Sequence, residues 1–288
     1  MKLMMFEESG AARLGAIDGE SVVDLKACGA GLPETLQALI EAGPEALATV
    51  ADAVRSASDA TQLARDAVKP AIPLPRPGKF ICVGLNYALH AKEGGHDTPE
   101  YPSFFVRWPT SLVAADAPVI RPKVSEQLDY EGELTIVIGK GGRHIAEADA
   151  LDHVFGYTIF NDASVRHFQR KTSQWTAGKN FDGTGPLGPV VVTPDELPAG
   201  ASGLRITTRL NGETRQDSNT SDMIFSTARV IAILSEFMTL EAGDVIATGT
   251  PSGVAHAMTP PGWMKAGDVV EVEIEGIGIL RNPVVDEA

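Results

Sequence analysis

Short hydrophobic runs that fit strands dominate the chain beyond residue 79. They are rich in β-branched and aromatic residues, which favour strands, and they read FICVGLNY, SFFVRW, GELTIVIG, VFGYTIFND, GPVVVT, GLRITTRL and VVEVEIEGIGIL. The pattern becomes helical from Ser226 to Phe237, where apolar residues recur at helical spacing, namely Val230, Ile233, Leu234 and Phe237. Asn211–Gly212 lies between two strand-like segments and is typical of a type I′ hairpin turn. Strands and helices do not alternate regularly, so the pattern indicates an α+β fold.

The amino-terminal part has a different pattern. Residues 1–26 predict short strands with a turn at Asp18–Gly19, and residues 33–67 predict Ala-rich helical segments. The segment KPAIPLPRPGK follows, and its prolines at 70, 73, 75 and 77 forbid a helix and favour an extended connector. We therefore predict a small α/β domain over residues 1–72 and a larger α+β domain over residues 73–288.

Composition narrows the possible partners and compartment. The chain has 38 acidic and 24 basic residues and a net charge of −14, which repels phosphate backbones and argues against nucleic acid as a partner. Cys28 and Cys82 are too few for a disulfide framework or a zinc cluster. No stretch resembles a signal peptide or a membrane-spanning helix. We expect a cytoplasmic protein that does not bind membranes.

Two acids stand at the start of a hydrophobic strand, in the stretch DYEGELTIVIG. Side chains alternate between the two faces of a strand, so Glu131 and Glu133 point the same way. Buried carboxylates are costly unless something pairs with them, and a hard divalent cation is a good partner. The alternative is a strand that starts at a sheet edge, where both acids are solvated.

Three other segments carry candidate chemistry. In GLNYALHAKE, His90 and Glu93 are three residues apart, so a helix would bring them together and the imidazole would become a stronger base; an exposed helix start is the alternative. Asp162 ends an apolar strand and is a third candidate oxygen ligand. Lys179 lies between glycines and aromatic residues, where it is either a desolvated cation or a solvated loop residue. The loop after VIATG offers amides and hydroxyls to a carboxylate, or is only a turn.

The segment GTGPLG, residues 183–188, matches the dinucleotide fingerprint GxGxxG only in its letters. That fingerprint requires a helix after the glycines. Here Pro186 and Pro189 interrupt the segment and the strand-like run GPVVVT follows, which argues against nucleotide binding. The chain also has no GxSxG nucleophile elbow and no GxxxxGK[ST] phosphate loop.

The chain resembles the fumarylacetoacetate hydrolase family. The resemblance runs from about Lys79 to near the carboxyl end, through the ordered motifs GLNYALHAKE, DYEGELTIVIGK, GYTIFNDAS, QWTAGKNFDGTGPLGP, SDMIF and FMTLEAGDVIATGTPSGV. It is similar to the acylpyruvases and 2-oxohept-3-ene-dioate-type members of that family. The resemblance implies a catalytic domain with a mixed β-roll/β-sandwich fold, a small α/β amino-terminal domain and a homodimer.

The resemblance also implies roles for particular residues. Glu131, Glu133 and Asp162 match three carboxylates that bind one divalent cation, Mg²⁺ or Mn²⁺ and sometimes Ca²⁺. His90 and Glu93 match a catalytic dyad on a mobile segment, and Lys179 matches an active-site lysine. The residues expected to contact substrate are Arg107, Gln174 and Thr250. Arg107 stands where many relatives carry lysine, which weakens the transfer of an exact substrate.

The expected substrate is a small anionic 2-oxo acid, and several reactions fit it. The first expectation is metal-dependent hydrolysis of a C–C bond in a β-diketo acid, such as an acylpyruvate or a 2,4-diketo acid, with His90 activating water. The alternatives on the same scaffold are decarboxylation or isomerisation of oxaloacetate or of 2-oxo-ene-dicarboxylates, which need the metal but no water attack. A non-catalytic relative that only binds metal or ligand is a further alternative.

Overall fold

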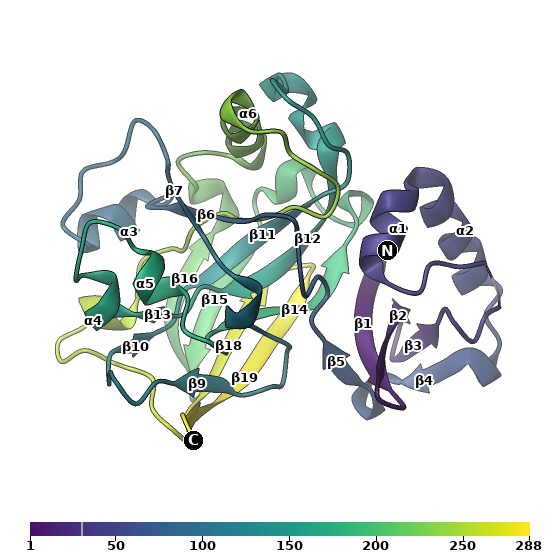
Figure 1. Ribbon diagram of the computed structural model, residues 1–288, viewed down its shortest axis with the longest axis horizontal. Coiled ribbons are helices and arrows are strands. Elements are labelled where there is room, and N and C mark those ends of the chain that lie inside the picture. Colours follow the sequence, from purple (N-terminus) through teal and green to yellow (C-terminus); the bar gives the residue numbers. More distant parts are fainter. Residues whose placement is uncertain (30) are drawn as a thin grey trace.

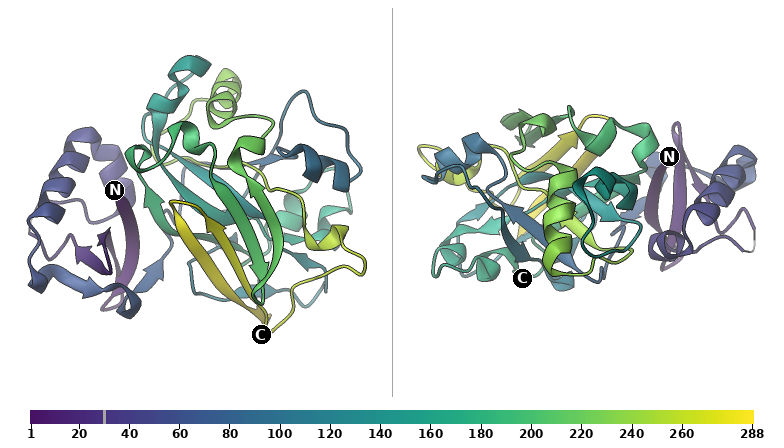
Figure 2. Two further views of the ribbon diagram at one scale, coloured as in Figure 1. Left: turned by 180° about the vertical axis from the view of Figure 1, so that it is seen from behind. Right: turned by 90° about the horizontal axis from the view of Figure 1, so that it is seen from above.

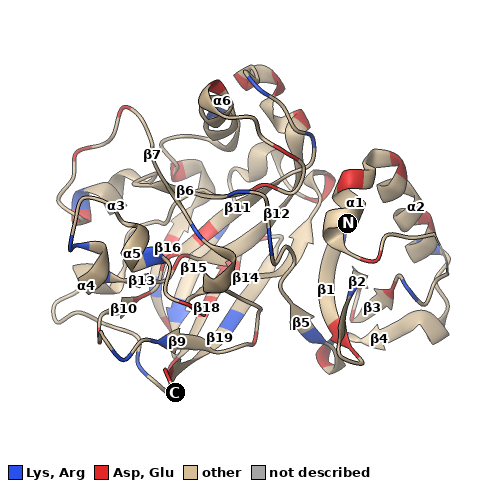
Figure 3. Ribbon diagram, in the orientation of Figure 1, with Lys and Arg blue, Asp and Glu red and all other residues tan. Residues whose placement is uncertain are grey.

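Two large sheets form the framework of the computed structural model, which describes residues 1–29 and 31–288 (Figure 1). The larger sheet has 12 strands, the smaller sheet is 5-stranded, and a separate strand pair lies beside them. This arrangement confirms the predicted α+β class. Charged residues of both signs are distributed over the whole molecule (Figure 3), so the negative net charge does not mark one region.

The centre of the larger sheet comes from the second part of the chain. In spatial order its strands are β14 (Gly185–Val192), β12 (Val154–Asn161), β11 (Gly132–Ile138), β17 (Val245–Ala247), β6 (Phe80–Gly84) and β7 (Ser103–Val106). β17 runs parallel to β6, whereas β11 is antiparallel to both β12 and β17. All residues of β11 are buried, because structure covers both faces of this strand.

The smaller sheet packs against this centre. Its strands, in spatial order, are β16 (Glu213–Asn219), β15 (Arg205–Leu210), β18 (Val269–Ile274), β19 (Gly278–Asp286) and β9 (Val119–Arg121). The predicted hairpin is confirmed, since Asn211 and Gly212 have φ angles of 54° and 79° and link the paired residues Leu210 and Glu213.

Helix α6 (Thr227–Phe237) matches the predicted amphipathic helix and lies over the strands (Figure 2). Three of its predicted core residues are fully or almost fully buried in the main apolar core, namely Val230, Ile233 and Leu234. Phe237 differs, because 49% of it is exposed. Its ring centroid lies 5.8 Å from that of Phe104, near the edge strand β7. The last turn of the apolar stripe therefore faces the surface beside β7.

The amino-terminal part extends the larger sheet. Its elements are β1 (Lys2–Glu8), β2 (Ala11–Asp18), β3 (Ser21–Asp24), α1 (Leu36–Ala42), α2 (Pro44–Arg55), β4 (Gln62–Ala64) and β5 (Lys69–Ala71). The helical prediction for residues 33–67 is wrong at β4, which pairs with β3. β1 pairs with β14, so the sheet crosses the predicted boundary at residue 72.

Short elements gather at the opposite end of the molecule from the amino-terminal part (Figure 1). They are α3 (Ala88–Glu93), β10 (Leu128–Asp129), β13 (Ser164–Val165), α4 (Arg166–Gln169) and α5 (Thr176–Lys179). A further short strand, β8 (Leu112–Val113), pairs with β14 of the larger sheet. These elements bring the candidate residues together.

Gly132, between the two acids, allows the sheets to approach closely. A Cβ at this position would lie 2.4 Å from Thr208 Oγ1 and 2.8 Å from a methyl group of Val272, both in the smaller sheet. A larger residue would push the sheets apart at the site of the two acids.

The segment GTGPLG runs directly into strand β14, and no helix follows it. The predicted strand after the glycines is therefore confirmed. Within residues 1–29 and 31–288, no helix has the length and hydropathy needed to cross a membrane.

Candidate active site

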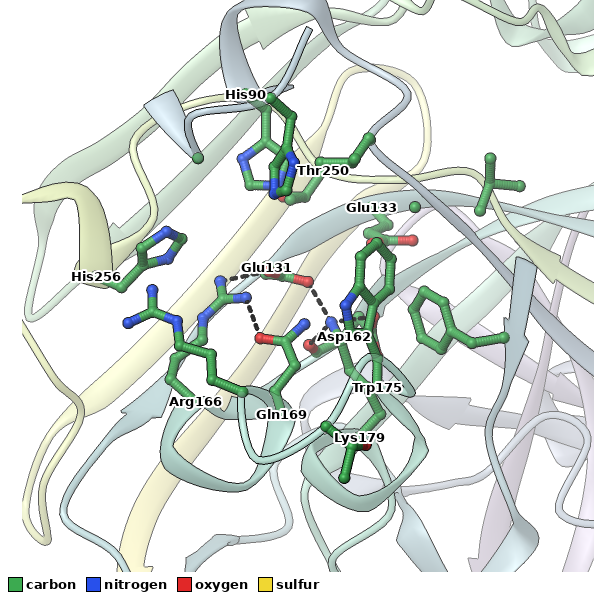
Figure 4. A pocket seen from close by; sticks show the side chains of 18 residues that line it. His90, Glu131, Glu133, Asp162, Arg166, Gln169, Trp175, Lys179, Thr250 and His256 are labelled. Atoms are coloured by element: carbon green, nitrogen blue, oxygen red, sulfur yellow. Dashed lines mark hydrogen bonds and ion pairs between the residues drawn. The ribbon is translucent and has the colours of Figure 1, made fainter. Parts of the chain in front are cut away.

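Glu131, Glu133 and Asp162 form one buried acidic cluster (Figure 4). Gly132 of β11 pairs with Asn161 of β12, so the start of one strand lies beside the end of the other. One carboxylate oxygen from each acid lies within 4.8 Å of the others. The solvated-edge alternative is wrong, because all three side chains are buried.

Lys179 and Arg166 donate hydrogen bonds to this cluster, and Arg107 Nη1 lies 3.4 Å from Asp162 Oδ1. Lys179 Nζ donates to Glu131 Oε2 and to Asp162 Oδ2, each at 2.5 Å, and more weakly to the backbone carbonyl of Asp162 at 3.3 Å. Arg166 donates from Nη2 to Glu131 Oε1 and from Nε to Asp129 Oδ2 at 2.8 Å. Lys179 is only 2% exposed, so it is the desolvated cation and not a solvated loop residue. Its contacts make it a counter-ion of the acids.

Ion pairing and burial shift the pKa values of these groups in different directions. Burial would raise the pKa of Glu131, but Arg166 and Lys179 outweigh it and hold this pKa well below its usual range. Burial, and then the charges of Asp162 and Glu131, raise the pKa of Glu133 well above its usual range. Burial would lower the pKa of Lys179, but Asp162 and Glu131 raise it, so the ammonium stays charged.

The acidic cluster fits a hard divalent cation. Asp162 Oδ1 is buried and makes no hydrogen bond within the described part of the chain, although Arg107 Nη1 lies 3.4 Å from it. Glu133 Oε2 accepts a hydrogen bond from Gly249 N at 2.9 Å, and burial together with the nearby acids raises the pKa of Glu133. Unsatisfied, mutually repelling carboxylate oxygens are the ligands that Mg²⁺ and Mn²⁺ prefer.

His90 and Glu93 form the predicted pair on α3. His90 Nδ1 lies 2.9 Å from Glu93 Oε1, and Gly253 N donates to Glu93 Oε2 at 3.0 Å. A carboxylate accepts hydrogen bonds, so Nδ1 is the donor in this pair, and in the neutral imidazole Nε2 is then the acceptor nitrogen. Figure 4 shows His90 on the side of the cavity opposite Arg166 and Gln169, with Glu131 between them.

Thr250 lies in the cavity wall, on the loop that follows β17. Its Oγ1 donates to the carbonyl of Gly132 at 2.9 Å and accepts from Gln216 Nε2 at 2.8 Å. The hydroxyl thus ties the loop to the start of β11.

The other two predicted substrate-binding residues lie away from the cavity. Arg107 is buried behind Asp162, where it donates to the backbone carbonyls of Ala163 and Lys179. Gln174 is exposed and does not line the cavity, whereas Gln169 of α4 does. Gln169 Oε1 accepts a hydrogen bond from Arg166 Nη1 at 2.8 Å.

The cavity has a volume of about 300 Å³ and is also lined by residues that sequence reasoning missed. Trp175 packs against Gly84, where a Cβ would fall 2.2 Å from the indole, and its ring lies 5.6 Å from that of Phe105. His256 comes from a short 3₁₀ turn, with Nδ1 3.4 Å from Asp129 Oδ2. Of the missed residues, only Arg166 carries a sequence signal, because it follows Asp162 by four positions at the start of a short polar segment.

Known proteins resemble both the sequence and this fold. The family model for the fumarylacetoacetate (FAA) hydrolase C-terminal domain matches residues 79–285. A mitochondrial oxaloacetate tautomerase of Xenopus laevis is 41% identical over 293 residues, which cover 99% of this chain and 90% of that protein.

Two solved structures cover the whole chain. A fumarylacetoacetate hydrolase from Exiguobacterium antarcticum is 40% identical with a TM-score of 0.87, and each chain is covered to 100%. A maleylpyruvate hydrolase from Sphingobium is 30% identical with a TM-score of 0.83, again with 100% of both chains covered. The sequence, the fold and the acidic site agree, and the chain belongs to the fumarylacetoacetate hydrolase family.

Proposed function

We propose that this chain is a divalent-cation-dependent tautomerase that interconverts the keto and enol forms of oxaloacetate or of a closely related short 2-oxo dicarboxylic acid. The observation that carries this proposal is the His90 imidazole, paired through Nδ1 with Glu93, which lines the same cavity of about 300 Å³ as the buried carboxylates. The oxaloacetate tautomerase of Xenopus laevis, 41% identical over 99% of this chain, supports isomerisation over the hydrolysis that we first expected.

Glu131, Glu133 and Asp162 are the residues that would hold the cation, Mg²⁺ or Mn²⁺. When bound, the cation would supply a Lewis acid that makes the carbon next to the 2-oxo group more acidic. Lys179 and Arg166 keep Glu131 ionised, because their charges outweigh the effect of burial. Lys179 also keeps Asp162 paired through Oδ2.

His90 is the base in this proposal. The C3–H bond of the keto acid breaks, the proton goes to His90 Nε2, and the electron pair becomes the C2=C3 double bond. The π pair of the C2=O bond moves onto its oxygen, which takes a proton from solvent, and His90 returns its own proton to solvent. Glu93 holds the imidazole in the tautomer that leaves Nε2 free, and Gly253 N holds Glu93 in place.

The test follows the ultraviolet absorbance of the enol form of oxaloacetate, with products checked by mass. We expect protein with Mg²⁺ or Mn²⁺ to accelerate the interconversion without changing the mass. His90→Asn should slow it by roughly 10²–10⁴-fold, the usual contribution of a general base. His144→Asn is the control, because His144 is exposed and its φ of 54° suits asparagine. Release of CO₂, or equal rates for the two variants, would contradict the proposal.

C–C bond hydrolysis of a β-diketo acid is the second candidate. The His90–Glu93 pair that removes a carbon-bound proton is also placed to remove one from water. The maleylpyruvate hydrolase, similar over the whole chain, favours this reading. Incubation with an acylpyruvate separates the two candidates, since hydrolysis yields two smaller acids and tautomerisation leaves the mass unchanged.

We also propose that the chain forms the homodimer that the family resemblance implies and acts in the cytoplasm. In support of a dimer, β7 is an edge strand of the larger sheet. Exposed aromatic residues adjoin it, with Tyr101 54% and Trp108 53% exposed. Light scattering of the purified chain tests the dimer, and a mass of one chain at micromolar concentration would contradict it.

A further inference from the structure

We propose that Arg170 binds the carboxylate at the far end of the substrate, and so makes this site selective for 2-oxo acids that carry a second carboxylate. This inference rests on the proposed function for its substrate class. It assigns a specificity residue on the cavity rim, apart from the acidic cluster and the His90–Glu93 pair.

The turn of helix at α4 places Arg170 at the cavity. Its backbone N donates to the carbonyl of Arg166 at 3.1 Å, which closes one helical turn. Residues three and four apart lie on one face of a helix, so Arg166, Gln169 and Arg170 share a face. All three line the cavity. Arg166 is buried, whereas Arg170 is exposed, so this face runs from the cavity floor to its mouth.

The other permanent cations that line the cavity already have anionic partners. Arg166 forms ion pairs with Glu131 and Asp129. Lys179 forms ion pairs with Glu131 and Asp162. Within residues 1–29 and 31–288, the side chain of Arg170 makes no ion pair and no hydrogen bond, and only its backbone N–H is bonded, within the turn of α4. Its guanidinium is therefore available for an anion that enters from solvent.

The remaining walls leave few other places for a second carboxylate. Val83, Phe105 and Trp175 present apolar surface, and Glu131 and Glu133 would repel an anion. A short dicarboxylate fits the cavity of about 300 Å³, with one carboxylate at the cation that the acidic cluster would hold and the other at Arg170. His96 and His256 also line the cavity and are the competing receptors.

Lys171 provides a matched control. It neighbours Arg170 and carries the same charge, but its Nζ lies 3.6 Å from the ring centroid of Phe168 and it does not line the cavity. Neutralising Lys171 removes one surface charge close to the mouth without removing a cavity residue. If neutralising Arg170 weakens anion binding and neutralising Lys171 does not, the loss comes from a direct contact with Arg170 and not from general attraction of an anion to the surface.

The experiment measures binding of two ligands that cannot tautomerise. Malate and 2-hydroxybutyrate have the same number of carbons, and 2-hydroxybutyrate has a methyl group where malate has its second carboxylate. Calorimetric titration of the Mg²⁺-loaded protein gives both Kd values for the wild type, Arg170→Gln and Lys171→Gln. We expect the wild type to prefer malate. Arg170→Gln should weaken malate binding about 10-fold or more, the worth of a charged hydrogen bond, and leave 2-hydroxybutyrate unchanged.

Further outcomes separate this inference from the proposed function. Lys171→Gln should retain the malate preference, and added salt should reduce it, because Arg170 is exposed. Equal affinity of the wild type for both ligands, binding of neither, or a malate preference that survives in Arg170→Gln would overturn the inference. Loss of the preference in Arg170→Gln, together with no oxaloacetate tautomerisation by the wild type, would support Arg170 and reject the proposed function.

Discussion

The floor and the rim of the cavity are built in different ways. The floor lies where β11 begins and β12 ends, and its acids are buried between two sheets and paired with buried cations. The rim consists of the short helices α3 and α4, of 6 and 4 residues, whose outer residues are exposed. A sheet fixes its side chains more firmly than a short surface helix does. The comparison teaches that the sheets hold the acids that would bind the cation, whereas the rim carries the proposed base, His90, and the residue proposed to select the substrate, Arg170.

Replacing the buried side chain of Lys179 in the floor should have the largest effect, a loss of stability. Lys179→Met leaves Glu131 and Asp162 with one fewer buried partner, and breaking a buried ion pair in this way costs about 3–5 kcal/mol of unfolding free energy. Denaturant unfolding of the metal-free protein measures this cost. Lys171→Met removes a cation from the surface near the rim and should change stability little. Similar costs for the two variants would remove the distinction between floor and rim.

Changing one acid of the floor should weaken metal binding strongly and leave the rim intact. Asp162→Asn keeps the shape but loses the charge, so we expect the affinity for Mn²⁺ to fall by more than about 100-fold, the upper range for changes in a metal's outer shell. Titration calorimetry gives the affinity, and Asp182→Asn, at an exposed position, is the control. An unchanged affinity in Asp162→Asn would mean that the acidic cluster does not hold the ion.

A change at the rim should affect turnover and spare stability. Glu93→Gln replaces a charged acceptor for His90 Nδ1 by a neutral one, and the difference between such hydrogen bonds predicts a loss of about 10-fold in kcat. The melting temperature and the Mn²⁺ affinity should stay at wild-type values. If the variant instead loses metal affinity, then α3 belongs to the floor and the comparison fails.

Sequence predicted those parts of the site that depend on local spacing. Glu131 and Glu133 share a strand face, and His90 and Glu93 share a helical turn, so each pair follows from neighbouring positions. Asp162 was predicted as a ligand from its position at the end of an apolar strand. Its closeness to the other two acids follows from the pairing of β11 with β12.

Long-range packing decided the rest. His256 and Trp175 reach the cavity from segments whose local sequence does not indicate where they fold. Arg107 follows the edge strand β7, and its side chain turns inward to bind backbone carbonyls behind Asp162. Gln174 precedes α5, and the loop there exposes it. In the fold as a whole, strand composition predicted the sheet centre, but it carried no sign that β1 pairs with β14 across the predicted domain boundary.

Hydrogen exchange at C3 of oxaloacetate tests the central claim most directly. The wild-type protein is incubated with oxaloacetate in D₂O, with Mg²⁺ or with a chelator, and deuterium at C3 is followed by NMR against an enzyme-free control. We predict metal-dependent deuterium incorporation above the control, without loss of carbon and with suppression by the chelator. Carbon loss as CO₂, or incorporation no faster than in the control, would contradict the assignment of this site as a tautomerase.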